Sequence, residues 1–277
     1  MTTSHMHAYQ QRYGLRPEHE LPVCNDTLML QLKHRSCRKF TEEIIPNDVL
    51  STLLASAFSA PSKSDLQQIS VINIADIKIK AEIISNNPLL KWVEQAPVLL
   101  IWCGDSRRIR TLSDHREHTF ANDHLDAFMN AAVDAGMVMQ NFIISAESIG
   151  LGCCPISQVR DSINSLSNIL KLPKWVFPVA GLAVGFPQDA GHVSMRLPNT
   201  VTVHQNVYDD TNDVQHVGDY DKRREGVHPT PDAAQLHPQL FGISEEYGWS
   251  EQHTRQYAVP MRTDFGDYIR KQGFNLK

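Results

Sequence analysis

The run VFPVAGLAVGF, residues 176–186, is apolar along almost its whole length and closes with Gly185 and the following Pro187. A second apolar run, APVLLIWCGD, covers residues 96–105, and QQISVINIAD at residues 67–76 is rich in β-branched side chains. Such short runs bounded by polar or turn residues predict β-strands, and a continuous apolar run predicts a strand buried on both faces. The three runs therefore predict a sheet enclosed within the core.

Helical segments alternate with these strands. Residues 123–148 carry apolar side chains around most of a helical circumference, which predicts a helix inside the core. Residues 47–57, after Pro46, and residues 26–33, with Asn25 or Asp26 as N-cap, have helical spacing. Residues 251–274 are also rich in helix formers.

The two ends of the chain differ from its middle. Residues 1–24 are polar and predict an N-terminal arm, while residues 206–248 are rich in Asp, His and Pro and favour an extended excursion. The expected organisation is an arm (1–24), a core (25–205) and a C-terminal excursion and helix (206–277).

Composition excludes several classes of protein. The 277 residues are 42% apolar and include 26 basic and 31 acidic side chains, for a net charge of −5. This balance gives no electrostatic reason to expect nucleic acid or membrane as a partner. There is no apolar span of about 20 residues and no basic, apolar leader, so a cytoplasmic location is the default expectation.

Several familiar motifs are absent, and two cysteine and histidine patterns are ambiguous. The sequence has no GxGxxG after a strand, no P-loop and no GxSxG; GLGCC at 150–154 follows a helix. His115, His118 and His124 could hold a metal, but their stretch is polar throughout and favours a solvated loop, so no metal is expected. The five cysteines lack CxxC spacing, and Cys153-Cys154 is either a reactive pair or a packing pair.

A cationic cluster follows the helix at 26–33. It contains His34, Arg35, Ser36, Arg38 and Lys39, whose guanidinium, imidazole and hydroxyl groups suit a phosphate. The alternative is a solvated turn paired with Glu42 and Glu43. The Ser-rich loop with Ser62, Lys63, Ser64 and Gln67 could bind the edge of a heterocycle, or serve as a linker.

In this order, a series of segments resembles the FMN-dependent nitroreductase superfamily, within it the branch of oxygen-insensitive NADPH nitroreductases and NADPH flavin reductases. The segments span nearly the whole chain, from about Leu28 to Phe274. They are HRSCRKF (34–40), PSKSDLQ (61–67), AESIGLGCCPISQVRD (146–161), KLPKWVFPVAGLAVGFP (171–187), MRLP (195–198), HQNVYDD (204–210), Tyr220-Asp221, GWSEQHTR (248–255) and DYIRKQGF (267–274).

The resemblance implies an α+β fold, a mixed β-sheet packed by helices, in an intertwined homodimer with FMN at the interface. For the motif HRSCRKF, the resemblance implies that His34, Arg35, Ser36 and Arg38 bind FMN. For the motif MRLP, it implies that Arg196 binds FMN. It also implies that Ser62, Ser64 and Gln67 reach the cofactor from the partner subunit, and that Gly152, Cys153, Pro155 and Ile156 lie against the flavin ring. Residues 206–277 would then wrap the partner.

The activity implied is transfer of two electrons, as hydride, from NADPH to nitroaromatics, quinones or flavins by a ping-pong mechanism. NADH is a possible donor, and no side chain is expected to act as acid or base, because the cofactor carries the chemistry. Against this resemblance three departures stand out. Ser194 stands where the branch usually carries a lysine, and Cys153 where a second glycine commonly follows GLG. Residues 223–248 are longer than usual and lack the paired arginines with which relatives grip the NADPH 2′-phosphate, for which Arg223 and Arg224 are the candidate substitutes. The alternative hypothesis is a flavin- or nucleotide-binding regulator without efficient turnover.

Overall fold

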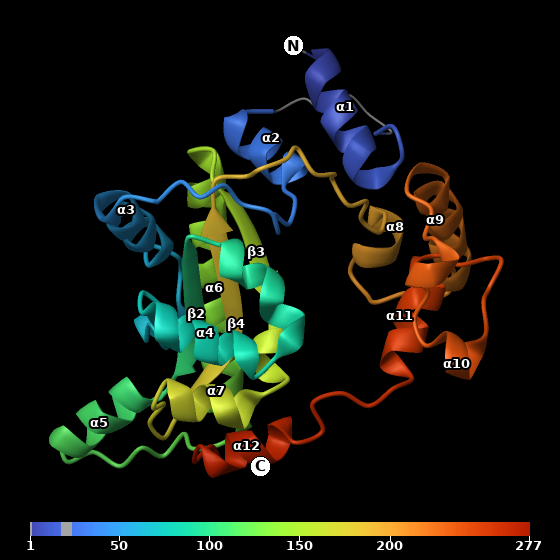
Figure 1. Cartoon of the computed structure of the whole chain (residues 1–277). Helices are drawn as coiled ribbons and strands as arrows, with labels where there is room; N and C mark the ends of the chain where they lie inside the picture. Colours follow the sequence, from blue (N-terminus) through green and yellow to red (C-terminus); the bar gives the residue numbers. More distant parts are fainter. Residues whose placement is uncertain (1, 18–23) are drawn as a thin grey trace. The chain divides into compact units, whose positions relative to one another are not determined.

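The computed structural model describes residues 2–17 and 24–277 of the chain. These residues form two compact units, each built from two separate stretches of sequence (Figure 1). The first unit comprises Met1–His34 and His192–Met261, and the second comprises Arg35–Gly191 and Arg262–Lys277.

The second unit is built on a four-stranded sheet whose order is β1-β2-β4-β3, with every neighbouring pair antiparallel. Its strands are β1 (Ile69–Asn73), β2 (Val98–Asp105), β3 (Gly152–Ile156) and β4 (Val176–Gly185). The three predicted apolar runs are confirmed as β1, β2 and β4. A parallel pairing is added by the isolated bridge between Ser36 and Cys153.

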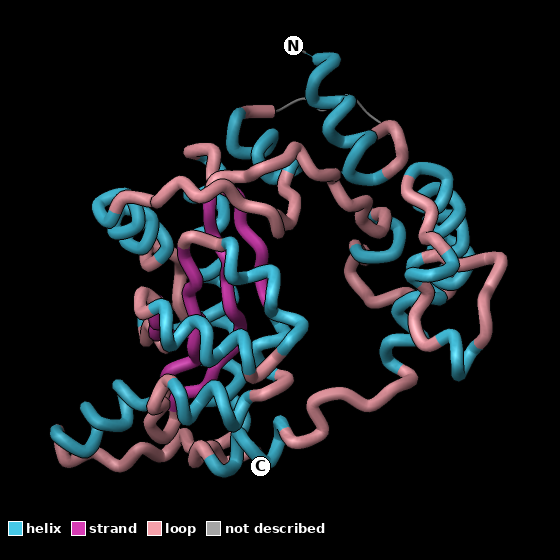
Figure 2. Tube along the Cα trace, viewed as in Figure 1, coloured by secondary structure: helices cyan, strands magenta, loops and turns pink. Residues whose placement is uncertain are grey.

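Helices cover both faces of this sheet, which confirms the predicted α+β class (Figures 1 and 2). On one face Leu100 and Trp102 of β2 pack with α3 and α6, and on the other Leu99, Ile101 and Cys103 pack with α4, η2 and α7. Because both faces of β2 are buried, successive residues of this strand must all be apolar, although the sheet is antiparallel. The helices are α3 (Asn47–Ala57), α6 (Leu125–Ser148), α4 (Ile77–Ser85), η2 (Pro88–Gln95) and α7 (Ile163–Ile169).

The prediction that the helix at 123–148 lies inside the core holds for one face of α6 only. Phe142 and Ile143 are buried in the cluster that packs on the sheet. Leu125, Met129, Val133 and Met137, spaced four residues apart, are exposed and form an apolar stripe on the opposite face. We call these four residues the α6 stripe.

The second unit also contains α5 (Arg107–His115) and α12 (Phe265–Lys271). Tyr268 and Ile269 of α12 pack with Phe177 of β4 in a third apolar cluster. The segment predicted as helical at 251–274 thus forms parts of two helices, α11 (Trp249–Tyr257) in the first unit and α12 in the second.

The first unit is helical. Its elements are α1 (Thr2–Tyr13), α2 (Asp26–Lys33), α8 (Asn199–Thr202), α9 (Asp213–Val227), α10 (Pro238–Phe241) and α11 (Trp249–Tyr257). The expectation of an extended excursion at 206–248 was wrong for residues 213–227, which form α9. Tyr220 is the buried residue of α9, so the sequence lacks the apolar period that identifies a helix. Part of the predicted arm, Thr2–Tyr13, is also helical, whereas its residues 18–23 lie outside the described residues.

Across residues 2–17 and 24–277, no helix is long and apolar enough to cross a membrane.

Candidate functional site

The cationic cluster lies against the edge strand β3. The Cys37 N–H donates to the carbonyl of Cys153 at 2.8 Å, and Phe40 forms a second isolated bridge, with Pro187. Within this segment Cys37 and Phe40 are buried, while Ser36, Arg38 and Lys39 are exposed. The cluster is therefore held by backbone pairing to the sheet and is not a free, solvated turn.

Arg35 of this cluster packs against a loop that follows β4. Its Nη2 donates to the carbonyl of Asp189 at 2.6 Å, and Lys39 pairs with the Asp189 carboxylate at 3.5 Å. Gly191, at φ +56°, lies so close that an added Cβ would be 2.7 Å from Arg35 Nη1. A guanidinium with one neutral carbonyl acceptor retains donors and its full charge for an anion.

Strand β3 places the predicted residues 152–156 in two environments. Cys153 and Ile156 are buried, in the clusters on opposite faces of the sheet, and Pro155 is exposed. A Cβ on Gly152 would lie 2.7 Å from the Cys37 Cβ and 2.8 Å from its Sγ, so glycine permits the close approach of the cationic cluster. The Cys153 side chain points into the core.

The paired cysteines do not form a reactive dithiol. Cys153 and Cys154 enter different clusters because successive strand residues face opposite ways, and all five cysteines are free thiols. Burial raises the pKa of Cys153 well above its ordinary value, and it also raises the pKa of Cys154 despite the opposing effect of the nearby Arg38. Both groups are protonated at neutral pH, so the packing interpretation holds.

The Ser-rich loop is held by α6 and not by the cationic cluster. The Lys63 and Gln68 N–H groups both donate to the carboxylate of Asp134 on α6. Within the loop, Gln67 N–H donates to Ser62 Oγ at 2.7 Å, while Ser64 and Gln67 side chains are exposed. The loop therefore presents polar side chains from a fixed backbone and is not a slack linker.

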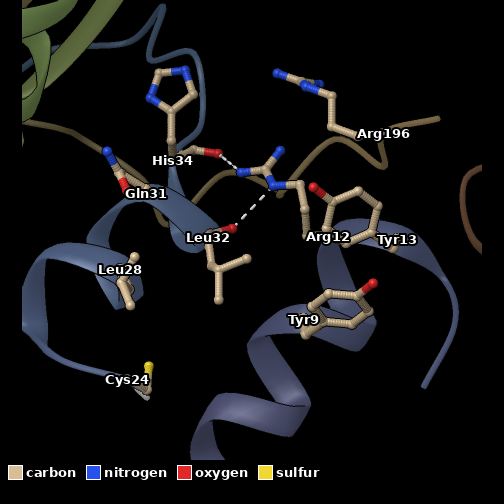
Figure 3. Close-up of a pocket in the computed structure, with 9 residues that line it drawn as sticks. All are labelled: Tyr9, Arg12, Tyr13, Cys24, Leu28, Gln31, Leu32, His34 and Arg196. Atoms are coloured by element: carbon tan, nitrogen blue, oxygen red, sulfur yellow. Dashed lines mark hydrogen bonds between the residues drawn. The ribbon is translucent and has the colours of Figure 1, made fainter. Parts of the chain in front are cut away.

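His34 and Arg196 belong to the first unit and line one pocket of about 460 Å³ between α1 and α2 (Figure 3). Tyr9 and Tyr13 of α1 form an aromatic wall, with ring centroids 4.7 Å apart. The structure thus brings these two predicted residues together in one concave surface. The other ten predicted residues all lie in the second unit.

Arg12 is a site residue that sequence reasoning missed. The residue is 5% exposed, and its guanidinium donates to the carbonyls of Leu32, His34 and Ser194, as Figure 3 shows for the first two. In addition, the Arg196 N–H donates to the Arg12 carbonyl at 2.7 Å. Arg12 therefore ties together the segments that carry His34 and Arg196. The sequence carries no signal for this role, because α1 is polar and the acceptors of Arg12 lie 20, 22 and 182 positions away.

The metal hypothesis receives no support from geometry. His115 is the last residue of α5 and His124 is the N-cap of α6, so the polar stretch is partly helical. In the part of the chain that the structure describes, no three His, Cys, Asp or Glu side chains are grouped to hold a metal ion.

An antiparallel sheet covered by helices on both faces, with a cationic segment along its edge strand, makes this an α+β protein. The chain belongs to the nitroreductase family: it matches the "Nitroreductase family" over residues 32–85 and 76–186, and the "Nitroreductase family, C-terminal domain" over residues 194–277.

Named relatives and solved structures agree with this assignment. "FMN reductase (NADPH)" of Bacillus subtilis is 30% identical over 258 residues, covering 91% of this chain and 99% of the relative. "Oxygen-insensitive NADPH nitroreductase" of Salmonella typhimurium is 30% identical over 248 residues, covering 90% and 98%. The structure of "NADPH:FMN oxidoreductase from Vibrio harveyi complexed with NAD+" has a TM-score of 0.78 at 28% identity, covering 90% of this chain and 98% of that one.

Proposed function

We propose that this protein is an FMN-dependent oxidoreductase that passes two electrons, as hydride, from NADPH to nitroaromatics, quinones or flavins in a ping-pong cycle. The observation that carries the proposal is the cationic segment along β3, in a chain whose relatives named for NADPH and FMN align over 91% of its length. The residue set supports FMN as the cofactor. Bound FMN would supply reversible two-electron chemistry that no side chain here can provide.

The chemistry of the donors fits a flavin mononucleotide. Arg35 and Arg38 offer charged forks and Ser36 a hydroxyl, suited to a phosphate and a ribityl chain. Gly152 and Pro155 of β3 would lie against the ring with Cys153 and Ile156 behind them, since both of these side chains are buried in the core. We assign His34 and Arg196 to the same cofactor, with Arg38 or Arg196 stabilising negative charge on the reduced ring electrostatically.

We infer that the active form is a homodimer. The α6 stripe supports this: Met129 is 59% and Val133 46% exposed in the single chain, and four aligned apolar side chains on a core helix are costly to leave in water. A second copy of α6 would cover the stripe and bring the Ser-rich loop, which the same helix holds, to the partner's flavin. In this arrangement the excursion that begins at residue 206, with exposed Val207, Tyr208 and Val214, wraps the partner, whereas α12 at the end of the predicted segment 206–277 packs on β4 of its own chain. The predicted core at 25–205 and the arm at 1–24 are kept as proposed.

The donor is assigned as NADPH, with NADH as the weaker alternative. Arg223 and Arg224 on α9 are the cations available for a 2′-phosphate, although Arg224 pairs with Glu225 at 3.3 Å. We place the enzyme in the cytoplasm, which is consistent with five free thiols.

The test is the spectrum of the purified protein. We expect a yellow protein with a flavin absorption band that NADPH bleaches anaerobically, faster than NADH does, and that a quinone or nitro compound restores. A colourless protein that cannot be reconstituted with FMN would reject the proposal. A bound flavin that neither nucleotide reduces would instead indicate the non-catalytic regulator.

Arg35→Ala tests the assignment of the cationic segment. Removal of a charged phosphate contact is expected to weaken FMN binding by about 1.5 to 3 kcal/mol. Lys33→Ala, two residues earlier and outside the assigned set, is the matched control and should retain wild-type affinity. FMN titration of both apoproteins, followed by flavin fluorescence, makes the comparison; equal affinities would remove Arg35 from the site.

A further inference from the structure

The backbone of the Ser-rich loop is strained. Ser64, Asp65 and Gln67 have φ values of 52°, 56° and 50°. This left-handed region is unfavourable for residues with a Cβ, and three such residues within four positions need support from outside the loop. The supporting groups come from α6 and α5.

Asp134 holds the N–H groups at the two ends of the loop. Its side chain is 0% exposed, and Oδ1 accepts from Lys63 N–H at 3.2 Å while Oδ2 accepts from Gln68 N–H at 3.0 Å. A carboxylate accepts on both oxygens, so a single side chain can satisfy both donors. Asparagine has one acceptor oxygen and would direct an NH₂ group at one of the two N–H groups. The chemistry therefore requires an acid at this position.

Arg108 holds the carbonyl groups where the loop meets β1. Its Nη1 donates to the Gln67 carbonyl at 2.7 Å and its Nη2 to the Ile69 carbonyl at 3.1 Å. Arg108 is itself fixed by Asp105, which accepts its backbone N–H at 3.3 Å and pairs with its guanidinium at 3.4 Å. The loop is thus held by the Asp134 carboxylate at its N–H groups and by the Arg108 guanidinium at its carbonyl groups.

We propose that Asp134 and Arg108 are positioning residues for flavin binding: together they hold residues 62–68 in the backbone geometry that presents Ser62, Ser64 and Gln67 to the cofactor. Neither side chain is required to touch the flavin. The inference rests on the proposed function, because it assigns the loop to the FMN site. The two side chains would favour flavin binding by preorganisation, since a loop already in its bound geometry loses less conformational entropy on binding.

Hydrogen exchange tests the loop geometry without any flavin. In apoprotein carrying Asp134→Asn, we expect faster exchange in a peptide covering residues 61–68, because at least one of the two N–H groups loses its acceptor. A peptide covering β2 should exchange as in wild type. Unchanged exchange at 61–68 would overturn the positioning role, whether or not the protein binds FMN.

Flavin titration tests the consequence for the site. We expect Asp134→Asn to weaken FMN binding about tenfold, the effect of losing one charge-assisted hydrogen bond. Asn141→Ala is the matched control on the same helix, because Asn141 Nδ2 donates to the Ser56 carbonyl at 2.9 Å and does not contact the loop. A loss of affinity in the control equal to that in Asp134→Asn, at similar thermal stability, would assign the effect to the fold and overturn the inference.

Arg108→Gln provides a second variant in case Asp134→Asn fails to fold, since the Arg108 side chain is half exposed. We expect weaker FMN binding with an unchanged melting temperature of the apoprotein, and partial recovery in Arg108→Lys, which can reach one carbonyl. Wild-type FMN affinity in Arg108→Gln would contradict the proposal. Wild-type protein that binds no FMN would reject the proposed function, and the exchange experiment would still decide the loop geometry.

Discussion

Cys103 illustrates how strongly a single position in this sheet depends on its surroundings. It lies on β2 with no exposed surface, and burial, with a smaller effect of the Asp105 carboxylate, raises the pKa of its thiol to about 12. The group is therefore protonated throughout the physiological range in the folded state. In the unfolded chain the same thiol ionises near its ordinary pKa of 9.0.

This difference predicts a loss of stability at alkaline pH. Below pH 9 the Cys103 thiol is protonated in both states and has no effect; between pH 9 and about 12 only the unfolded state releases the proton. The free energy of unfolding should therefore fall as pH rises, by up to about 1.4 kcal/mol per pH unit from this group. The free energy of unfolding can be measured with urea at several pH values between about 8 and 10. It should fall less steeply with pH for Cys103→Ala than for wild type. Cys24→Ala, at a partly exposed thiol, is the control; identical slopes for all three proteins would contradict the assignment.

Among the elements, β3 depends on a close contact at Gly152. It carries the cationic cluster through the hydrogen bond from Cys37 N–H to the Cys153 carbonyl, and Gly152 leaves the space in which Cys37 lies. The neighbouring Pro187 Cγ would be 3.0 Å from an added Cβ, so there is no free direction for a larger residue. Packing and site geometry are therefore coupled at this glycine.

Gly152→Ala should consequently destabilise the protein and weaken flavin binding together. Forcing one methyl group into a packed contact costs about 1 to 3 kcal/mol. Gly218→Ala on α9 is the control, because an added Cβ meets nothing within 4 Å there, and it should be neutral or stabilising by about 0.5 to 1 kcal/mol. Chemical denaturation gives the free energy of unfolding of both variants and of wild type. A fully stable Gly152→Ala protein would contradict the contact.

The elements also explain what the sequence could and could not predict. Strands β1, β2 and β4 and helix α6 were identified because burial leaves long apolar runs or periods. Strand β3 was missed because five residues that include glycine and proline carry no such run. The Ser-rich loop was identified by composition, but Asp134 was not, because its role arises from hydrogen bonds across 71 and 66 positions of the chain.

For the whole molecule, the feature that bears on assembly is the α6 stripe. A helix of 24 residues with one face on the sheet leaves a second apolar face uncovered in the single chain. Because the same helix anchors the Ser-rich loop through Asp134, assembly and flavin binding are expected to be linked.

Met129→Glu should therefore convert the proposed dimer to monomers and release the flavin. A charged carboxylate in an apolar interface lacks a partner, and its desolvation opposes association. Leu112→Glu, at a similarly exposed leucine on α5 outside the stripe, is the control and should remain dimeric. Analytical ultracentrifugation of both proteins, with absorbance at the flavin band, measures mass and cofactor together. A dimeric, flavin-loaded Met129→Glu protein would place the interface elsewhere.

The hydrogen bond from Arg12 to the Ser194 carbonyl joins residues 182 positions apart. At about 5 to 20 residues per second on the ribosome, this means that α1 emerges roughly 10 to 40 seconds before its acceptor exists. The polar composition of residues 1–17 suits this interval, because a waiting segment with few apolar side chains offers little to nascent-chain chaperones or to aggregation.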